Sequence, residues 1–322
     1  MRAIQIKRYG GPEVLELVEL PDPVPGPGEA LVRVHIGGVN FTDIYQRTGT
    51  YPGTLPFTPG VEGVGVVEKL GSGVTEVKVG DRVGWAMIKG SYAELAVLPA
   101  QRLVPVPASV DDRTAAAILL QGMTAHFLLT DCYPVKKGQW ILIHAAAGGV
   151  GLLLTQVAHR MGARIIGTTS SEEKAKLARE AGADEIVLYT KEDFQEAARR
   201  ITGGEGVSAV YDSVGKTTFL KSIDSLRPRG YMVLFGGSSG PPPTIDPMIL
   251  YHKGSLFLTR PTLGNYVSSR EELLRRASDV FDWAAKGEIK VRAEHDYPLA
   301  SAAQAQTDME ARKTTGKVLL VI

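Results

Sequence analysis

The spacing of hydrophobic and polar positions changes once along the chain, near residue 110. Up to about residue 107, apolar and polar positions alternate in short runs such as EALVRVHIGGV and GVGVVEKLG. Glycine and proline separate these runs, as in PDPVPGPGE, and such punctuation is typical of antiparallel strands. We therefore expect an all-β region here, curled into a barrel.

A long Ala- and Leu-rich stretch, DDRTAAAILLQGMTAHFLLT, begins next, with Asp111 or Asp112 placed to cap a helix. Strand-like and helix-like runs then alternate, beginning with WILIHA, GVGLLLTQVAHRMG, RIIGTT and SEEKAKLAREAG. This alternation predicts βαβ units, which build a parallel sheet with helices on both faces. A last helix-like stretch, SREELLRRASDVFDWAAKGE, precedes short segments that end in GKVLLVI.

Composition narrows the class of protein. The length of 322 residues, with 44% hydrophobic, predicts two domains with sizeable cores. Lys and Arg number 36 against 35 Asp and Glu, without a basic block, which argues against nucleic acid as a partner. The single cysteine, Cys132, excludes an internal disulfide framework and favours the cytoplasm. The N-terminus has the pattern of neither a signal peptide nor a membrane span.

A turn of small residues follows the strand-like run WILIHA. Ala146, Gly148 and Gly151 occupy the three positions of the G-x-G-x-x-G dinucleotide fingerprint, directly before a helix-like run. Bare backbone at a helix N-terminus lets a pyrophosphate approach unpaired N–H groups. The alternative is a tight turn whose glycines serve packing alone. The residues predicted to contact the dinucleotide here are Ala147, Gly148, Gly149 and Val150.

The next strand-like run, ARIIGTTSS, indicates which cofactor binds. An NAD site usually ends this strand with an acid about 20 residues after the turn, whereas Glu172 and Glu173 come later, at the next helix start. Ser170, Ser171 and Lys174 instead favour the extra phosphate of NADP. The other interpretation, compatible with this one, is a capping box from Ser170 to Glu173 with a solvated lysine.

Several motifs in order resemble one family. They are GVNFTDIYQRTGTYP, PFTPGVEGVGVV, VGDRV, QGMTAHFLL, AAAGGVG, YDSVG, FGGSSG, TRP and TGKVLL. Across essentially the whole chain the sequence resembles the zinc-free NADPH:quinone reductases related to ζ-crystallin, within the medium-chain dehydrogenase/reductase superfamily. The resemblance implies an α/β protein with its active site in a cleft between two domains. These are a GroES-like β-barrel catalytic domain, residues 1–123 completed by 263–322, and a Rossmann NADPH-binding domain with a doubly wound parallel sheet, residues 124–262.

The chain departs from the zinc alcohol dehydrogenases of that superfamily at the metal ligands. Asn40 stands where those enzymes carry a zinc-binding cysteine, and Val61 stands before Glu62 where they have histidine. A catalytic zinc needs three protein ligands and an open position. We therefore predict no metal, which disfavours Lewis-acid alcohol oxidation.

The resemblance assigns catalytic positions to NFTDIYQRTGTYP. It implies that Asn40 and Tyr45 face the nicotinamide and that Tyr51 walls the substrate pocket, with Asp43 in the same stretch. The alternative for Asn40 and Asp43 is a helix start, with Asn40 as N-cap and Asp43 at the third helical position. The alternative for both tyrosines is core packing with the hydroxyl reaching water. Donor or stacking roles suit the tyrosines better than general acid catalysis.

The resemblance also implies further cofactor contacts. Thr124 corresponds to a threonine near the nicotinamide ribose, whereas its neighbour Gln121 could be a residue of the helix surface. Tyr189 and Arg312 correspond to contacts at the adenosine end, although Arg312 could be a surface arginine. Residues expected at the cofactor near strand ends are Ser213, Phe235 and Gly236. Two histidines are expected in the core rather than in catalysis, His126 and His144.

Three functions remain open. The leading one is NADPH-dependent reduction of quinones, by hydride or electron transfer, without a metal. The second is NADPH-dependent reduction of activated C=C bonds in enals, enones or enoyl thioesters, and the third is a non-catalytic, crystallin-like NADPH-binding protein. The expected partners are a small quinone or enone and a second copy of the chain, which by resemblance joins through the edge strand near Leu256 and Arg260. No membrane partner is expected.

Overall fold

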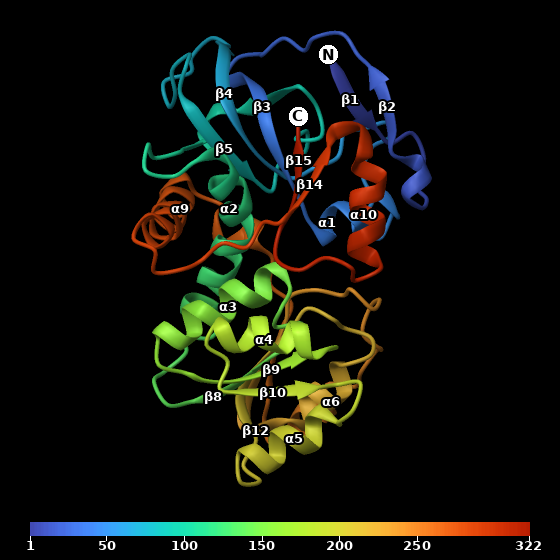
Figure 1. Ribbon diagram of the computed structural model, residues 1–322, viewed down its shortest axis with the longest axis vertical. Helices are drawn as coiled ribbons and strands as arrows, with labels where there is room; N and C mark the ends of the chain where they lie inside the picture. The colour runs from blue at the N-terminus through green and yellow to red at the C-terminus, as the bar shows by residue number, and fades with distance from the viewer. The chain divides into compact units, whose positions relative to one another are not determined.

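The computed structural model describes all 322 residues, and they form two compact units. Unit 1 consists of Met1–Met123 and Tyr266–Ile322, and unit 2 of Thr124–Asn265. The chain therefore leaves unit 1 once and returns to it, so that both chain ends lie in unit 1 (Figure 1).

Unit 1 is built on a mainly antiparallel sheet of order β14-β15-β3-β4-β5-β7, with β6 also paired to β3. The strands of this unit are β1 (Arg2–Gln5), β2 (Glu16–Glu19), β3 (Glu29–Val39), β4 (Glu62–Leu70), β5 (Arg82–Ala86), β6 (Leu95–Pro99), β7 (Val104–Pro105), β14 (His295–Pro298) and β15 (Val318–Val321). The C-terminal strand β15 pairs with β3 in the register Val318 to Val39. The last residues of the chain thus complete a sheet that the first hundred residues begin.

The helices of unit 1 are α1 (Phe41–Arg47), α2 (Asp112–Phe127), whose end from Thr124 on belongs to unit 2, α9 (Arg270–Ala285) and α10 (Ala302–Glu310), with short 3-10 turns η1 (Pro12–Val14), η2 (Ala100–Arg102) and η4 (Leu299–Ser301). Helix α8 (Leu263–Tyr266) lies where the chain returns from unit 2 to unit 1. Of the two aspartates predicted to cap α2, Asp111 does so, accepting a hydrogen bond from the Thr114 N–H at 2.8 Å. Asp112 instead binds Arg82 and His35.

Helix α2 continues into a π-helical turn, η3 (Leu128–Cys132). By length and composition alone, the stretch Asp112–Cys132 could cross a membrane, yet 78% of its apolar window is buried inside the protein. Such burial is what the core helix of a folded domain shows. The apolar character of this stretch is therefore explained by packing.

Helix α1 is attached to α10 by a buried arginine. Arg47 donates to the Gln306 Oε1 atom at 2.8 Å and to both carboxylate oxygens of Glu310 at 2.8 and 3.0 Å. It also donates to the Gly10 carbonyl oxygen at 3.2 Å. A guanidinium group has a planar set of donors that suits such simultaneous contacts. This anchor fixes the C-terminal end of α1, while α10 lies along β14 and β15 (Figure 1).

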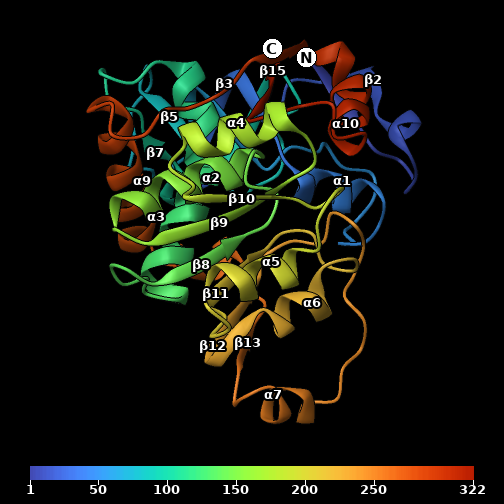
Figure 2. The ribbon, with the colours of Figure 1, turned by 60° about the horizontal axis from the view of Figure 1, so that its bottom comes forward.

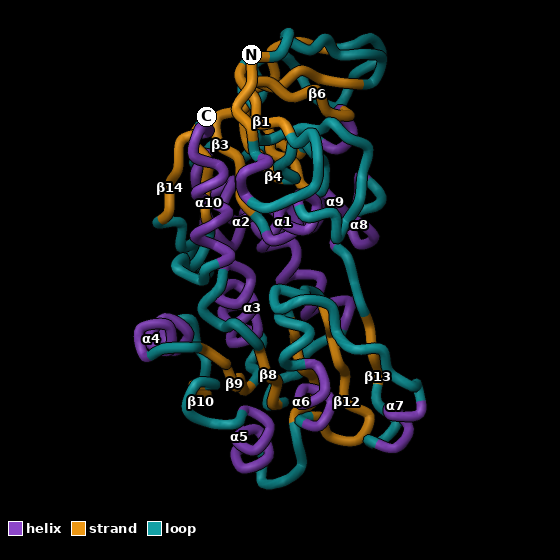
Figure 3. Tube along the Cα trace, turned by 90° about the vertical axis from the view of Figure 1, so that its right-hand side faces the viewer, coloured by secondary structure: helices purple, strands orange, loops and turns teal.

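Unit 2 is a parallel sheet of order β10-β9-β8-β11-β12-β13. Its strands are β8 (Trp140–Ile143), β9 (Arg164–Thr169), β10 (Glu185–Leu188), β11 (Val207–Asp212), β12 (Leu226–Leu234) and β13 (Phe257–Thr259), and its helices are α3 (Gly149–Arg160), α4 (Glu172–Glu180), α5 (Phe194–Ile201), α6 (Phe219–Asp224) and α7 (Met248–His252). The helices lie around the strands (Figure 3), and α7, at the bottom of Figure 2, packs Ile249 and Leu250 against the core cluster. The predicted α/β class is thus confirmed.

The sheet of unit 2 is apolar in the middle of its strands. Leu142, Ile166, Val187, Val210 and Met232, one from each of five neighbouring strands, belong to one buried cluster. Side chains of α5 and α6 pack on the same cluster. Near-continuous apolar strands are typical of parallel sheets covered on both faces. The buried polar residues Thr168, Thr169 and Asp212 lie at the carboxyl ends of β9 and β11, where the candidate site begins.

Candidate functional site

The strand order places a topological switch between β8 and β11. From β8 the chain runs outward to β9 and β10, then returns to β11 on the other side of β8 and continues to β12 and β13. In open α/β sheets, ligands bind outside the carboxyl ends of strands at such a switch point. The small-residue turn after β8 lies there.

That turn is packed too closely for side chains at one position. A Cβ atom on Gly151 would lie 2.2 Å from the Ala145 carbonyl oxygen and 2.9 Å from the Ala146 Cα atom. Glycine is therefore required at residue 151 to bring α3 against the turn. Around Gly148 the nearest obstacle to a Cβ atom is the Ala145 carbonyl oxygen, at 3.2 Å, so packing alone explains the last glycine and not the middle one.

The N-terminus of α3 has the features of a phosphate cradle. Gly148 is its N-cap residue, no side chain caps this end, and the first turn holds no acid. The first N–H groups of a helix lack partners within the helix and attract anions together with the helix dipole. The turn therefore fits the phosphates of a dinucleotide, and the predicted contacts Ala147, Gly148, Gly149 and Val150 all belong to it.

The end of β9 carries hydroxyl groups and no carboxylate. Ser171 caps α4, where its Oγ atom accepts from the Lys174 N–H at 3.4 Å. The predicted capping box from Ser170 to Glu173 is therefore wrong by one residue, because the helix begins at Glu172 and not before it. Ser170 is left between strand and cap, next to the helix start that the sequence associates with a 2′-phosphate.

The ends of β11 and β12 meet closely. A Cβ atom on Gly236 would lie 2.5 Å from the Ser213 carbonyl oxygen. The N–H groups of Phe235 and Gly236 donate to the Asp212 carbonyl oxygen at 2.9 and 3.3 Å. The structure thus brings together Ser213, Phe235 and Gly236, which the sequence predicted at the cofactor.

Three other predicted cofactor residues lie in different elements. Tyr189 follows β10 and donates its N–H to the Thr169 carbonyl oxygen at 3.1 Å, which places it beside the end of β9. Thr124 is buried within α2. Arg312 follows α10 with a left-handed φ of 58°. The two histidines predicted to lie in the core, His126 and His144, are buried and accept or donate hydrogen bonds.

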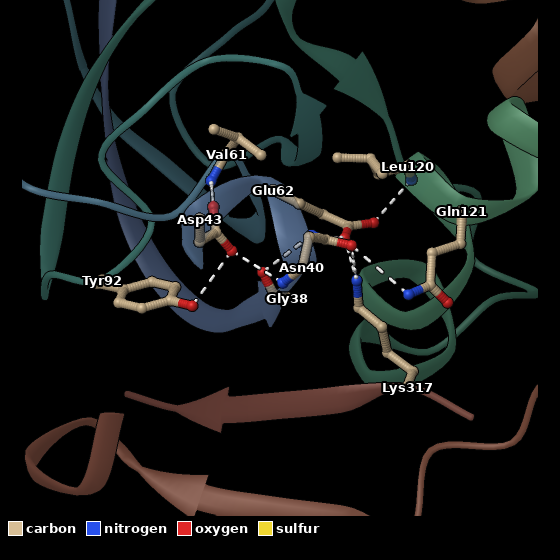
Figure 4. Close-up of polar contacts among 9 residues, drawn as sticks. All are labelled: Gly38, Asn40, Asp43, Val61, Glu62, Tyr92, Leu120, Gln121 and Lys317. Carbon is tan, nitrogen blue, oxygen red and sulfur yellow. Dashed lines mark hydrogen bonds and ion pairs between the residues drawn. The ribbon is translucent and has the colours of Figure 1, made fainter. Parts of the chain in front are cut away.

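A buried polar cluster in unit 1 surrounds Asn40, at the junction of β3 and α1 (Figure 4). The Asn40 Nδ2 atom donates to Glu62 Oε2 at 2.9 Å and to the Gly38 carbonyl oxygen at 3.2 Å. The Asn40 Oδ1 atom accepts from Lys317 Nζ at 2.8 Å and from Gln121 Nε2 at 3.5 Å. Both protons of the Asn40 amide are therefore used inside the unit.

Lys317 forms an ion pair with Glu62 in this cluster. Their side chains are 1% and 0% exposed. The other carboxylate oxygen of Glu62 accepts from the Leu120 N–H in α2 at 2.7 Å. Buried charges persist only when they are paired and hydrogen-bonded, and every contact of this pair joins a different segment of unit 1.

Two members of this Asn40 cluster, Gln121 and Lys317, escaped the sequence analysis. Gln121 was considered for the helix surface, yet it is 8% exposed and faces Asn40. Lys317 belongs to the motif TGKVLL, which served only to support the family resemblance. The available signal was a charged residue next to an apolar strand, together with Glu62 at the start of the apolar run EGVGVV.

Asp43 supports the start of α1. Its carboxylate accepts from the Asn40 N–H at 2.8 Å, from the Val61 N–H at 3.1 Å and from the Tyr92 hydroxyl at 3.2 Å. Burial raises the pKa of Asp43 to about 7, against the opposing effects of these hydrogen bonds and the Lys317 charge. Asp43 is fully buried and holds the helix start, with Asn40 as N-cap residue, as the alternative interpretation expected. Its catalytic assignment stays a prediction.

Aromatic side chains continue from α1 into the following turn. The ring centroids of Tyr45 and Tyr51 lie 5.1 Å apart with an interplanar angle of 69°, and those of Phe41 and Tyr45 lie 6.2 Å apart. Tyr51 is 42% exposed, so the core-packing interpretation is wrong for this residue. These three rings, the α1 aromatic surface, offer flat apolar area and hydroxyl groups to a ligand.

The residues around Asn40 do not fit a zinc ion. Nowhere in the structure do three or more His, Cys, Asp or Glu side chains converge in a way that could hold a metal. Cys132 lies in η3, in unit 2. Of the two carboxylates beside Asn40, that of Glu62 is paired with the Lys317 ammonium group, and that of Asp43 accepts from the Asn40 and Val61 N–H groups and the Tyr92 hydroxyl. Zinc sites need three or four deprotonated nitrogen, sulfur or oxygen ligands.

Comparison with known proteins shows full-length relatives. The family described as alcohol dehydrogenase GroES-like domain matches residues 26–108, and zinc-binding dehydrogenase matches residues 149–279. The quinone oxidoreductase of Pseudomonas aeruginosa is 45% identical, over 99% of each chain. The 2-haloacrylate reductase of a Burkholderia species is 41% identical, over 99% of this chain and 98% of the relative. The crystal structure of Escherichia coli quinone oxidoreductase complexed with NADPH is 41% identical, with a TM-score of 0.97 over 100% of both chains.

We predict that Lys317→Met destabilises the protein by about 3–5 kcal/mol, because it leaves the Glu62 carboxylate buried without its partner. The double variant Lys317→Met/Glu62→Gln should lose less stability than Lys317→Met alone, since the unpaired charge of Glu62 is then removed as well. Denaturant unfolding measures both free energies. Lys313→Met is the control, because this exposed lysine pairs only at the surface with Asp308 and should change stability by less than about 1 kcal/mol. Equal stability of Lys317→Met and wild type would contradict the prediction.

We predict that Asp43 makes stability depend on pH. Its pKa is about 7 in the folded protein and about 4 in an unfolded chain, so the folded state holds the proton more tightly. This contribution is complete below about pH 4 and is lost as the pH rises toward about 7, with a slope of at most about 1.4 kcal/mol per pH unit. The difference in unfolding free energy between wild type and Asp43→Asn should show this fall and then stay level above pH 7. A difference that is constant from pH 5 to pH 8 would refute it.

Proposed function

Since the chain belongs to the quinone oxidoreductase family, with its GroES-like and dehydrogenase domains, we propose that it reduces quinones with NADPH and without a metal ion. The observation that carries the cofactor choice is the acid-free end of β9 beside the uncapped start of α3. The E. coli relative with the same fold is a quinone oxidoreductase complexed with NADPH. We assign the dinucleotide-binding domain to residues 124–262 and the catalytic domain to residues 1–123 with 263–322.

Each part of the cofactor has a proposed set of contacts. The pyrophosphate is held by the α3 start, the 2′-phosphate by Ser170, Ser171 and Lys174, and the adenosine by Tyr189 and Arg312. The proposed contacts toward the nicotinamide end are Thr124, Ser213, Phe235 and Gly236. Backbone N–H groups and a lysine ammonium are the donors that phosphate oxygens require.

When bound, NADPH supplies the hydride, and the protein supplies binding, orientation and electrostatics. The α1 aromatic surface stacks on the planar quinone. A hydroxyl of Tyr45 or Tyr51 donates to the quinone oxygen, where negative charge develops during reduction. Asn40, which is predicted to face the nicotinamide, also anchors the start of α1, because its amide donates both protons to Gly38 and Glu62.

A second candidate is reduction of an activated C=C bond. The observation that favours it is the full-length similarity to a 2-haloacrylate reductase. This reaction needs hydride delivery to one carbon and a proton for the other. Tyr45 and Tyr51 are the hydroxyl groups available to that step on the α1 aromatic surface.

We also propose a homodimer in the cytoplasm. Strand β13 is the edge of the unit 2 sheet, and its residues Phe257 and Leu258 are exposed. The Phe257 ring stacks on Tyr231, with centroids 4.4 Å apart. An exposed apolar edge strand is a template for pairing with another strand, and a second copy of β13 is the proposed partner.

We predict that NADPH is oxidised with small quinones at a higher kcat/KM than NADH. Lys174→Met should reduce this preference by roughly 10-fold, the worth of one charge-assisted hydrogen bond. Lys176→Met, in the exposed part of the same helix, should leave the cofactor preference unchanged.

Steady-state kinetics over a panel of quinones and enones measures these values. Product analysis separates the two reactions, because reduction of the C=C bond of an enone yields a saturated ketone. Tighter use of NADH would overturn the cofactor choice. NADPH binding without turnover of any substrate would favour the non-catalytic alternative.

We predict a dimeric mass for the wild-type protein and a monomeric mass for Leu258→Lys. Two lysines facing each other across paired edge strands repel, and edge lysines are a natural device against strand pairing. Light scattering after size exclusion measures the mass. Val24→Lys, at a position 85% exposed in unit 1, is the control and should remain dimeric. A monomeric wild-type protein at micromolar concentration would refute the proposal.

A further inference from the structure

Four buried polar side chains form a continuous hydrogen-bonded chain across the carboxyl ends of three strands in unit 2. Thr168 Oγ1 lies 3.0 Å from His144 Nδ1, His144 Nε2 lies 2.9 Å from Ser222 Oγ, and Ser222 Oγ lies 3.0 Å from Asp212 Oδ2. All four residues are buried. We name this set the His144 relay. It joins the ends of β8, β9 and β11 to α6.

The chemistry of the partners fixes the direction of every hydrogen bond. The Asp212 carboxylate accepts, so the Ser222 hydroxyl donates to it. Ser222 Oγ then accepts from His144 Nε2–H, and the bare His144 Nδ1 atom accepts from the Thr168 hydroxyl. Burial lowers the pKa of His144, against the opposing Asp212 charge, and the edge of the Phe194 ring lies against the imidazole. The ring is therefore neutral, with its proton on Nε2.

One end of the relay holds the loop after β11. Asp212 Oδ1 accepts from the Val214 N–H at 2.7 Å and from the Gly215 N–H at 3.0 Å. Asp212 Oδ2 accepts from Thr218 Oγ1 at 2.7 Å in addition to Ser222. The Asp212 carboxylate thereby orients the turn that contains Ser213, and its backbone oxygen holds the end of β12.

The other end of the relay holds the small-residue turn and the end of β9. The Thr168 carbonyl oxygen accepts from the Ala146 N–H at 3.1 Å, within that turn. The chain continues from Thr168 directly to Ser170 and Ser171. His144 itself precedes the turn by one residue and donates its N–H to the Tyr211 carbonyl oxygen at 3.1 Å.

We propose that the His144 relay is a positioning device for the dinucleotide, which sets the loops after β8, β9 and β11 in one mutual arrangement. This proposal rests on NADPH binding, as proposed above. The surrounding cluster is apolar. If these four residues served packing alone, apolar side chains would fill their positions equally well. Breaking one hydrogen bond of such a chain leaves a buried polar group unpaired, which costs free energy. The chain is therefore complete in only one arrangement of the strand ends.

The two ends of the relay should affect different parts of the cofactor. Thr168 leads to the residues assigned to the 2′-phosphate, whereas Ser222 acts through Asp212 on the loop assigned to the nicotinamide end. Thr168→Val should therefore weaken NADPH binding more than NADH binding. Ser222→Ala should weaken both cofactors equally. All four members are buried and are assigned as positioning residues, which act through the loops that they hold.

The test measures the Kd of NADPH and of NADH by fluorescence titration of the full-length protein. Thr168→Val and Ser222→Ala, which keep nearly the same shape, should each raise the Kd of NADPH by about 3- to 10-fold, the worth of one buried hydrogen bond. In a His144→Leu background the two substitutions should have little further effect, since the relay is already broken.

Two half-replacements of the histidine sharpen the test. His144→Gln places an amide donor toward Ser222 and should preserve the Ser222 end, whereas His144→Asn places an acceptor toward Thr168 and should preserve that end. The NADPH-to-NADH ratio of His144→Asn should therefore be closer to wild type than that of His144→Gln. Thr155→Val is the matched control, because Thr155 is buried in α3 and its hydroxyl has no hydrogen-bond partner; its Kd values should equal those of wild type.

Unchanged Kd values in Thr168→Val and Ser222→Ala, together with a lowered melting temperature, would overturn the proposal. The relay would then only stabilise the fold. Failure of the proposed function has a different signature. In that case the wild-type protein itself does not bind NADPH, and the relay proposal is overturned with it.

Discussion

The buried ion pair between Lys317 and Glu62 joins distant segments of unit 1. Charges without access to water are tolerated only with partners in good geometry. This pair meets that requirement by recruiting Asn40 from the β3 end and the Leu120 N–H from α2. The start of α1, the C-terminal strand and the long core helix are therefore fixed by one set of contacts. The α1 aromatic surface begins at the helix start that these contacts fix.

Unit 2 uses the same physical principle at the edge of its sheet. The middle of each strand contributes to an apolar cluster, whereas polar side chains gather where the strands end. There Thr168, His144, Ser222 and Asp212 form one hydrogen-bonded chain. The helix N-terminus after Gly148, in contrast, has no side-chain cap, so its first N–H groups suit a ligand.

Local patterns in the sequence predicted what local physics determines. The change from alternating apolar and polar residues to alternating strand-like and helix-like runs predicted both units. The spacing of the small residues predicted the turn in which Gly151 is sterically required. The contact between Lys317 and Asn40 joins residues 277 positions apart, and no local pattern encodes it. For the same reason Gln121 escaped detection. The α4 cap at Ser171 was missed by one residue because two adjacent serines carry the same local signal.

The arrangement of protons in unit 1 supports the proposed reduction of quinones over that of alkenes. The Asn40 amide donates both of its protons within the protein, and Asp43 is enclosed by its own donors. The Asn40 amide thus has no proton left for a substrate and Asp43 is fully buried, so the hydroxyls of the α1 aromatic surface are the proposed donors. Reduction of a quinone needs one hydrogen bond to the product oxygen, which takes its proton from water. Alkene reduction requires the same hydroxyl to transfer a proton to carbon as well, which is the more demanding task.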